Sequence, residues 1–203
     1  MSTWMKKRFE SVGVTQYPVG EHLPAVQQRF GGTVILALDV SGSMSGGPLR
    51  DAVAGGQRFI TEALEGNYAV GVVLWHHDVA ARLAPCHDRR LLQGFLGAAH
   101  STGGTNVVPA LRYCGSVLEP LTGDRVIALF GDGDLGSPQE AKRVAGEIAA
   151  TGIRIITLGL GHDSASHLDV ISTEELAAPR VASAETLAED IAGLRSGLLR
   201  RVR

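Results

Sequence analysis

The chain has 203 residues, of which 44% are hydrophobic and 20% are charged, and its formal net charge is −2. This composition is that of a soluble globular protein, and the small net charge excludes a broad electrostatic attraction to nucleic acid or to a membrane surface. The sequence has no apolar run of the roughly 20 residues that span a bilayer. Its N-terminus lacks the apolar segment of a signal peptide, so we expect a cytoplasmic protein.

The length suits a single α/β domain with an ample core. We expect residues 1–32 to form an N-terminal extension that packs against the domain or serves a partner. Two X-Pro pairs, Tyr17-Pro18 and Leu23-Pro24, indicate turns within it. Residues 33–203 then form the folded domain.

Four apolar runs predict strands that are buried on both faces, at residues 33–38, 70–75, 126–130 and 153–158. A fifth strand at 79–83 follows the second after a three-residue link, which is too short for a parallel crossover. This strand is therefore expected to run antiparallel, at an edge of the sheet.

Helix start and stop signals separate these strands. They predict helices from Pro48 to about residue 64, after Asp88, from Asn106 to about residue 118, from the capping box Ser137-Pro138-Gln139-Glu140 to about residue 150, and over roughly 184–199. Alternation of strands and helices predicts an α/β fold with a mostly parallel sheet.

Oxygen-bearing side chains follow the predicted strands. Asp39, Ser41 and Ser43 come after the first strand, Thr105 lies in the loop before a helix, and Asp132 follows the strand at 126–130. Because the carboxyl ends of parallel strands gather at one edge of a sheet, we expect these groups to meet there. Two carboxylates and three hydroxyls make an all-oxygen site, which suits a hard divalent cation, with Mg²⁺ as the first choice.

The order of these motifs resembles the von Willebrand factor type A domain family over about residues 33–199. Asp39-Val40-Ser41-Gly42-Ser43 fits the DxSxS motif of the family's metal-ion-dependent adhesion site, and Gly103-Gly104-Thr105-Asn106 fits its threonine loop. Asp132-Gly133 fits its later aspartate, although Gly131 stands where threonine or serine is more usual.

The resemblance implies a doubly wound, Rossmann-like sheet of six strands in the order 3-2-1-4-5-6, with one antiparallel edge strand and helices on both faces. It implies that Mg²⁺ (or Mn²⁺ or Ca²⁺) is bound by Asp39, Ser41, Ser43, Thr105 and Asp132. An aspartate or glutamate of a partner protein would complete the metal shell, without enzymatic activity. Thr105 would bind the metal only in a ligand-competent state, with the last helix as the moving part. By analogy, a bacterial member of this size is an adaptor for a MoxR-type AAA ATPase or for another multi-gene system.

Simpler interpretations of these residues stay open. Asp39, Ser41 and Ser43 are also favoured as helix caps, Thr105 as a helix-entry residue, and Asp132 as a turn residue. The same site could serve a metal-dependent hydrolase acting on a phosphoester, or it could stay empty in a structural subunit.

Several enzyme classes are disfavoured. A phosphatase of the haloacid dehalogenase type needs a second aspartate where Ser41 stands, and an α/β-hydrolase needs its nucleophile where Met44 stands. The GxGxxG pattern at 131–136 contains two aspartates, which would repel a pyrophosphate. Adjacent His76 and His77 are expected to point in different directions, which favours the rim of a binding surface over a shared metal ion.

Overall fold

The computed structural model describes residues 32–160, 162–174 and 181–182. Most of the predicted N-terminal extension and the whole predicted helix at 184–199 lie outside the described residues. The division of the chain at residue 32 therefore stays a prediction.

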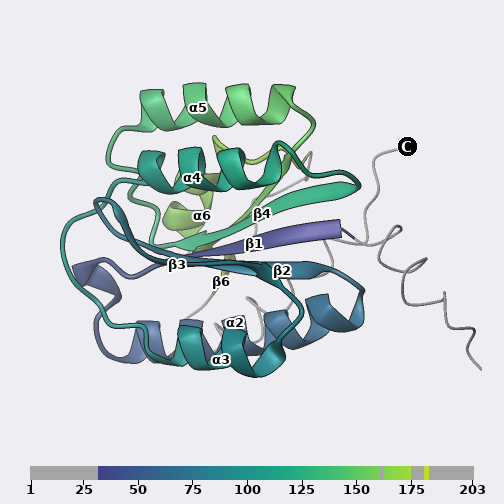
Figure 1. Ribbon diagram of the computed structural model, residues 1–203. Coiled ribbons are helices and arrows are strands. Elements are labelled where there is room, and N and C mark those ends of the chain that lie inside the picture. The colour runs from purple at the N-terminus through teal and green to yellow at the C-terminus, as the bar shows by residue number, and fades with distance from the viewer. Residues whose placement is uncertain (1–31, 161, 175–180, 183–203) are drawn as a thin grey trace, which may run out of the picture.

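A single twisted sheet runs through the centre of the molecule (Figure 1). Its strands are β1 (Gly32–Asp39), β2 (Ala69–Trp75), β3 (Val79–Cys86), β4 (Asp124–Gly131), β5 (Arg154–Leu160) and β6 (Val181–Ala182), in the order β3-β2-β1-β4-β5-β6. β3 pairs antiparallel with β2, and the other pairs are parallel. The mixed α/β sheet and its antiparallel edge strand were both predicted from the sequence.

The prediction of six full strands is wrong for the described residues. Five strands of seven or eight residues follow the expected order 3-2-1-4-5. The sixth position holds only the two residues of β6, which pair with Gly159 and Leu160 of β5.

Helices cover both faces of the sheet (Figure 1). They are α2 (Gly47–Glu65), α3 (Arg89–Gly97), α4 (Val108–Leu118), α5 (Pro138–Ala150) and α6 (His162–Asp169), with a short 3-10 turn η1 at Gly42–Met44. Within β1, Val34 and Leu36 face the core under α2 and α3, and Ile35 and Ala37 face the core under α4 and α5. Both faces of β1 are thus buried, as its continuous apolar run predicted.

Two local expectations differ from the structure. Ser137 makes no side-chain cap bond at the start of α5, and the Glu140 carboxylate pairs with Arg112 and Arg143. Helix α6, which begins at His162, was not predicted from the sequence. In contrast, Asp88 caps α3 as expected, accepting a bond from the Leu91 amide at 3.0 Å.

The sheet register sets the position of the candidate site. Leu38 of β1 pairs with Phe130 of β4, so the chain leaves both strands at the same level. Asp39 and Asp132 consequently emerge at one edge of the sheet. None of the helices in the described part of the chain has the length and hydrophobicity that a membrane span requires.

Candidate metal centre

Asp39 is the most deeply placed acidic residue of the site. It ends β1 and is fully buried. Its Oδ1 accepts a hydrogen bond from the Ser41 amide at 2.8 Å, whereas its Oδ2 is buried without a hydrogen-bond partner. A buried carboxylate oxygen without a partner is costly, and a bound cation would compensate for that cost.

A chain of oxygen atoms leads from Asp39 towards the surface. The hydroxyl of Ser41, which is 1% exposed, lies 3.0 Å from that of Ser43. Ser43 in turn donates a hydrogen bond to the carboxylate of Asp132. Asp39 and Ser41 are buried, Asp132 is half-buried and Ser43 is exposed, so the cluster is accessible from one side.

Thr105 belongs to a loop that is bonded directly to the DxSxS turn. The amide of Gly42 donates to the Gly103 carbonyl at 3.1 Å, and the amide of Thr102 donates to the Val40 carbonyl at 2.9 Å. Thr105 is half-buried, and its hydroxyl makes no hydrogen bond with any described residue. The structure therefore links Asp39, Ser41, Ser43 and Asp132 by direct contacts and brings in Thr105 only through its loop.

Burial raises the pKa of Asp39 to about 6, from its ordinary value of 3.8. Desolvation is the main cause, and the negative charge of Asp132 raises the pKa further. Hydrogen bonds from the amide and hydroxyl of Ser41 and from the Asp132 amide lower the pKa and oppose both effects. A carboxylate that is difficult to ionise beside a second carboxylate marks a place where a positive charge would be stabilised.

The chemistry of the side chains selects the kind of cation. No group of three or more His, Cys, Asp or Glu side chains that could hold a metal occurs among the residues described. A metal here would depend on two carboxylates, hydroxyls and water. This oxygen-only set suits Mg²⁺, Mn²⁺ or Ca²⁺ and is poor for the softer metals that prefer sulfur or imidazole.

Gly131 explains why Asp39 Oδ2 has no partner. A Cβ atom at this position would lie 3.3 Å from Asp39 Oδ2 and 3.2 Å from Cζ2 of Trp75. A serine or threonine at position 131 could therefore offer a hydroxyl to Oδ2, and glycine cannot. Glycine at position 131 therefore leaves the buried Oδ2 without this hydrogen bond.

The expectation that His76 and His77 point in different directions is wrong, because their rings stack at the rim of the threonine loop. The rings of His76 and His77 are 4.2 Å apart at an angle of 11°. The carbonyl of His76 accepts a bond from the Asn106 amide at 2.9 Å, and the His77 ring lies next to Gly103. The pair therefore supports the loop that carries Thr105.

A hollow of about 480 Å³ adjoins the candidate metal site and shares Asp132 with it. Its walls include Asp134, Leu135, Pro138, His167 and Val170. Sequence reasoning missed His167 and Val170, because they come from α6 and the residue after it. The only local signal was the weak spacing of Ala165 and Leu168, which both prove to be buried.

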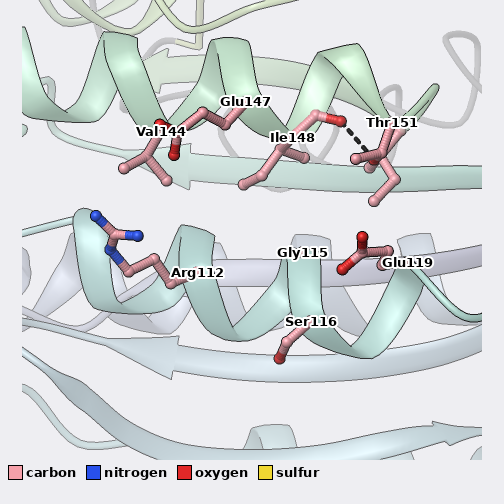
Figure 2. A pocket seen from close by; sticks show the side chains of 9 residues that line it. Arg112, Gly115, Ser116, Glu119, Val144, Glu147, Ile148 and Thr151 are labelled. Carbon is pink, nitrogen blue, oxygen red and sulfur yellow. Dashed lines mark hydrogen bonds between the residues drawn. The ribbon is translucent and has the colours of Figure 1, made fainter.

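A second hollow of about 310 Å³ lies between α4 and α5 (Figure 2). Arg112 and Gly115 of α4, together with Glu119 just after this helix, face Val144 and Ile148 of α5 across it (Figure 2). Its Glu119 end lies by the start of β4, since Arg125 donates to the Glu119 carbonyl at 3.1 Å. That is the end of the sheet opposite the candidate metal site.

Comparison with known proteins agrees with the observed fold. A family model described as the von Willebrand factor type A domain matches residues 34–134. This segment contains the DxSxS turn, the threonine loop and Asp132. A comparison with curated proteins found no match.

Solved structures give the same result for the fold. The vWF domain of the type V pili tip protein Mfa5 from Porphyromonas gingivalis has a TM-score of 0.72 and 14% identity, over 86% of this chain and 98% of that chain. A von Willebrand factor type A protein from Catenulispora acidiphila has a TM-score of 0.68 and 19% identity, over 81% of this chain and 42% of that one. The conserved hypothetical protein BatB from Bacteroides thetaiotaomicron has a TM-score of 0.61 and 19% identity, over 82% of this chain and 100% of that chain. At these identities, the similarity establishes the fold alone.

Proposed function

Because the chain belongs to the von Willebrand factor type A domain family, which often provides protein-interaction modules, we propose that it is a non-enzymatic module that binds a partner protein through a divalent cation. The cation would be held by Asp39, Ser41, Ser43, Thr105 and Asp132. When bound, it would supply a coordination position for an aspartate or glutamate of the partner.

The observation that carries this proposal is the continuous set of oxygen atoms at the strand ends. Ser41 contacts Ser43, Ser43 contacts Asp132, and the buried Asp39 presents an oxygen without a hydrogen-bond partner. A set of helix caps would not need these contacts, because a capping side chain bonds to the amides of its own helix. Neither η1 nor α2 has a side-chain cap bond at its start.

The proposed acidic partner residue follows from the charges at the site. Two protein carboxylates and neutral hydroxyls around a doubly charged ion leave it able to attract a further anionic oxygen. Ser43 is exposed and Asp132 is half-buried, so a side chain from another molecule can reach this side of the cluster.

The structural relatives support binding more than catalysis. They include a pili tip protein and the pilus adhesin SpaC from Lactobacillus rhamnosus GG, of whose chain this one spans 30%. The binding partners of these proteins are not assigned to this chain. A cytoplasmic adaptor of a MoxR-type AAA ATPase and an extracellular adhesin both fit the proposed module, and identifying the partner separates them.

Calorimetric titration of the full chain with MgCl₂ and MnCl₂ tests the metal site. Wild type should bind one ion, and Ser41→Ala should bind it at least about tenfold more weakly because a buried ligand is lost. Ser116→Ala is the matched control, since Ser116 is exposed on α4 and its hydroxyl bonds only to the Tyr113 carbonyl, at 2.8 Å. No heat with wild type would contradict the proposal and favour a structural subunit with an empty site.

Recovery of a partner from cell extract on the immobilised chain tests the function. The partner should be retained by wild type in Mg²⁺, and lost with a chelator or with Ser41→Ala. Recovery that is indifferent to the chelator would contradict metal-mediated binding. Mg²⁺- or Mn²⁺-dependent turnover of generic phosphoesters, abolished by Ser41→Ala, would favour a hydrolase instead.

A further inference from the structure

We propose that the hollow beside Asp132 is a second contact site for the same partner, and that it takes a lysine or arginine side chain within three residues of the metal-binding acidic residue. This inference rests on the proposed function, because it assumes that an acidic residue of the partner is held at the metal. It adds a basic residue to the short sequence that this chain would recognise in its partner.

The hollow exists because α6 lies directly against two glycines. A Cβ on Gly159 of β5 would be 2.2 Å from the amide nitrogen of Ala165, and one on Gly133 would be 2.5 Å from the Cα of Ser164. Any side chain at either position would push α6 away. This backbone contact brings His167 and Val170 opposite the loop that carries Asp132 and Asp134.

One wall of the hollow is apolar. Leu135 is 2% exposed, and Pro138 begins α5 next to it. Val170 is 46% exposed, which makes it one of three exposed large hydrophobic residues in the described part of the chain. An aliphatic chain in the hollow would cover Val170, and the stems of lysine and arginine are of this kind.

The rim of the hollow is negatively charged. Asp134 is exposed, its Oδ1 accepts a bond from the Gly136 amide at 2.8 Å, and within the described ranges no cation pairs with it. Asp132 lies beside it and would share its own charge with the metal. His167 faces the hollow from α6, and a neutral imidazole can accept a hydrogen bond from a cation. An apolar wall with an acidic rim suits the amphipathic side chain of lysine or arginine better than it suits a wholly apolar side chain.

The short distance between the two contact sites limits the spacing in the partner. Because Asp132 belongs to both sites, one short segment must reach the metal and the hollow together. An extended chain advances about 3.3 Å per residue, so three residues cover about 10 Å. A volume of about 480 Å³ has room for one long side chain and its bound water.

Selection from a random peptide library on the immobilised full chain in MgCl₂ tests the proposal. With wild type, the selected peptides should share an acidic residue with a lysine or arginine one to three positions away. Asp134→Asn should remove the preference for the basic residue and keep that for the acidic one. Asparagine has almost the same shape and retains an oxygen for the Gly136 amide, so the fold should be unaffected, as thermal unfolding can verify.

Glu119→Gln is the matched control, because it changes the net charge equally at the opposite end of the sheet and should keep the basic preference. One selected peptide, made with its basic residue or with methionine, completes a double-mutant cycle. The methionine peptide should bind wild type about tenfold more weakly, and Asp134→Asn should bind both peptides alike.

The outcomes separate this inference from the proposed function. Peptides that share an acidic residue without a basic one would overturn the second contact site alone, and so would a basic preference that survives Asp134→Asn. Selection of peptides without an acidic residue, or binding that persists in a chelator, would overturn the metal-mediated function.

Discussion

The hydroxyl of Ser43 donates a hydrogen bond to the carboxylate of Asp132, although 89 residues separate the two in the chain. The contact joins the turn after β1 to the loop after β4. It makes the DxSxS turn and the later aspartate one cluster instead of two independent loops.

Replacing Asp39 with asparagine should change how stability depends on pH without metal. The pKa of Asp39 is raised in the folded state, so the folded chain holds this proton more tightly than the unfolded one. Its contribution to stability is therefore full below about pH 4, and it declines as the pH rises to about 6. The difference in unfolding free energy, that of Asp39→Asn minus that of wild type, is measured by urea titration in EDTA. It should increase by about 2 kcal/mol between pH 4 and pH 7.5. A pH-independent difference would show that burial does not perturb this carboxyl.

Alanine at Ser43 should weaken metal binding more than alanine at Thr105. Ser43 contacts both Ser41 and Asp132, whereas the Thr105 hydroxyl bonds to none of the described residues. Calorimetry with Mg²⁺ should give a loss of at least about tenfold for Ser43→Ala and a smaller loss for Thr105→Ala. Equal losses would mean that Thr105 binds the metal even without a partner.

Gly159→Ala should destabilise the fold because its new methyl group would meet the backbone of α6 at Ala165. Forced overpacking costs typically 1–3 kcal/mol, so we expect a loss of about 2 kcal/mol or more in urea unfolding. Gly146→Ala is the matched control: Gly146 lies in α5 with no atom within 4 Å of the added carbon, and alanine there should stabilise by about 0.5–1 kcal/mol. Equal effects of the two substitutions would contradict the close contact of β5 with α6.

Gly131→Ser should be more stable than Gly131→Ala in the absence of metal. Both substitutions crowd Trp75 and Asp39 equally, but only serine can donate a hydrogen bond to Asp39 Oδ2. One recovered hydrogen bond to a buried group is worth about 1 kcal/mol. Urea unfolding in EDTA compares the two variants directly, and no advantage for serine would indicate that Oδ2 is satisfied in another way.

Local sequence patterns predicted helices and strands well where the pattern of apolar residues and the residues at the ends of the element indicate the same structure. The continuous apolar run of β1 reflects a strand with a core on each face, and Asp88 caps α3 through its own side chain. The capping box of α5 is not formed: Ser137 makes no cap bond, and the Glu140 carboxylate pairs instead with Arg112 of another helix, a partner that no local pattern indicates. Helix α6 escaped notice because it is short and buries only a few residues against β5.

The sequence alone determined which residue types follow each strand, and therefore that Asp39, Ser41, Ser43 and Asp132 would collect at one edge of a parallel sheet. It also predicts which class of metal such a site would suit, since that depends only on the type of ligand atom. Tertiary structure decided how these groups meet: which hydroxyl touches which carboxylate, which oxygen of Asp39 is left unpaired beside Gly131, and how closely α6 approaches Gly133 and Gly159. These are distances between segments far apart in the chain, and they depend on the packing of the whole core, which no local pattern encodes.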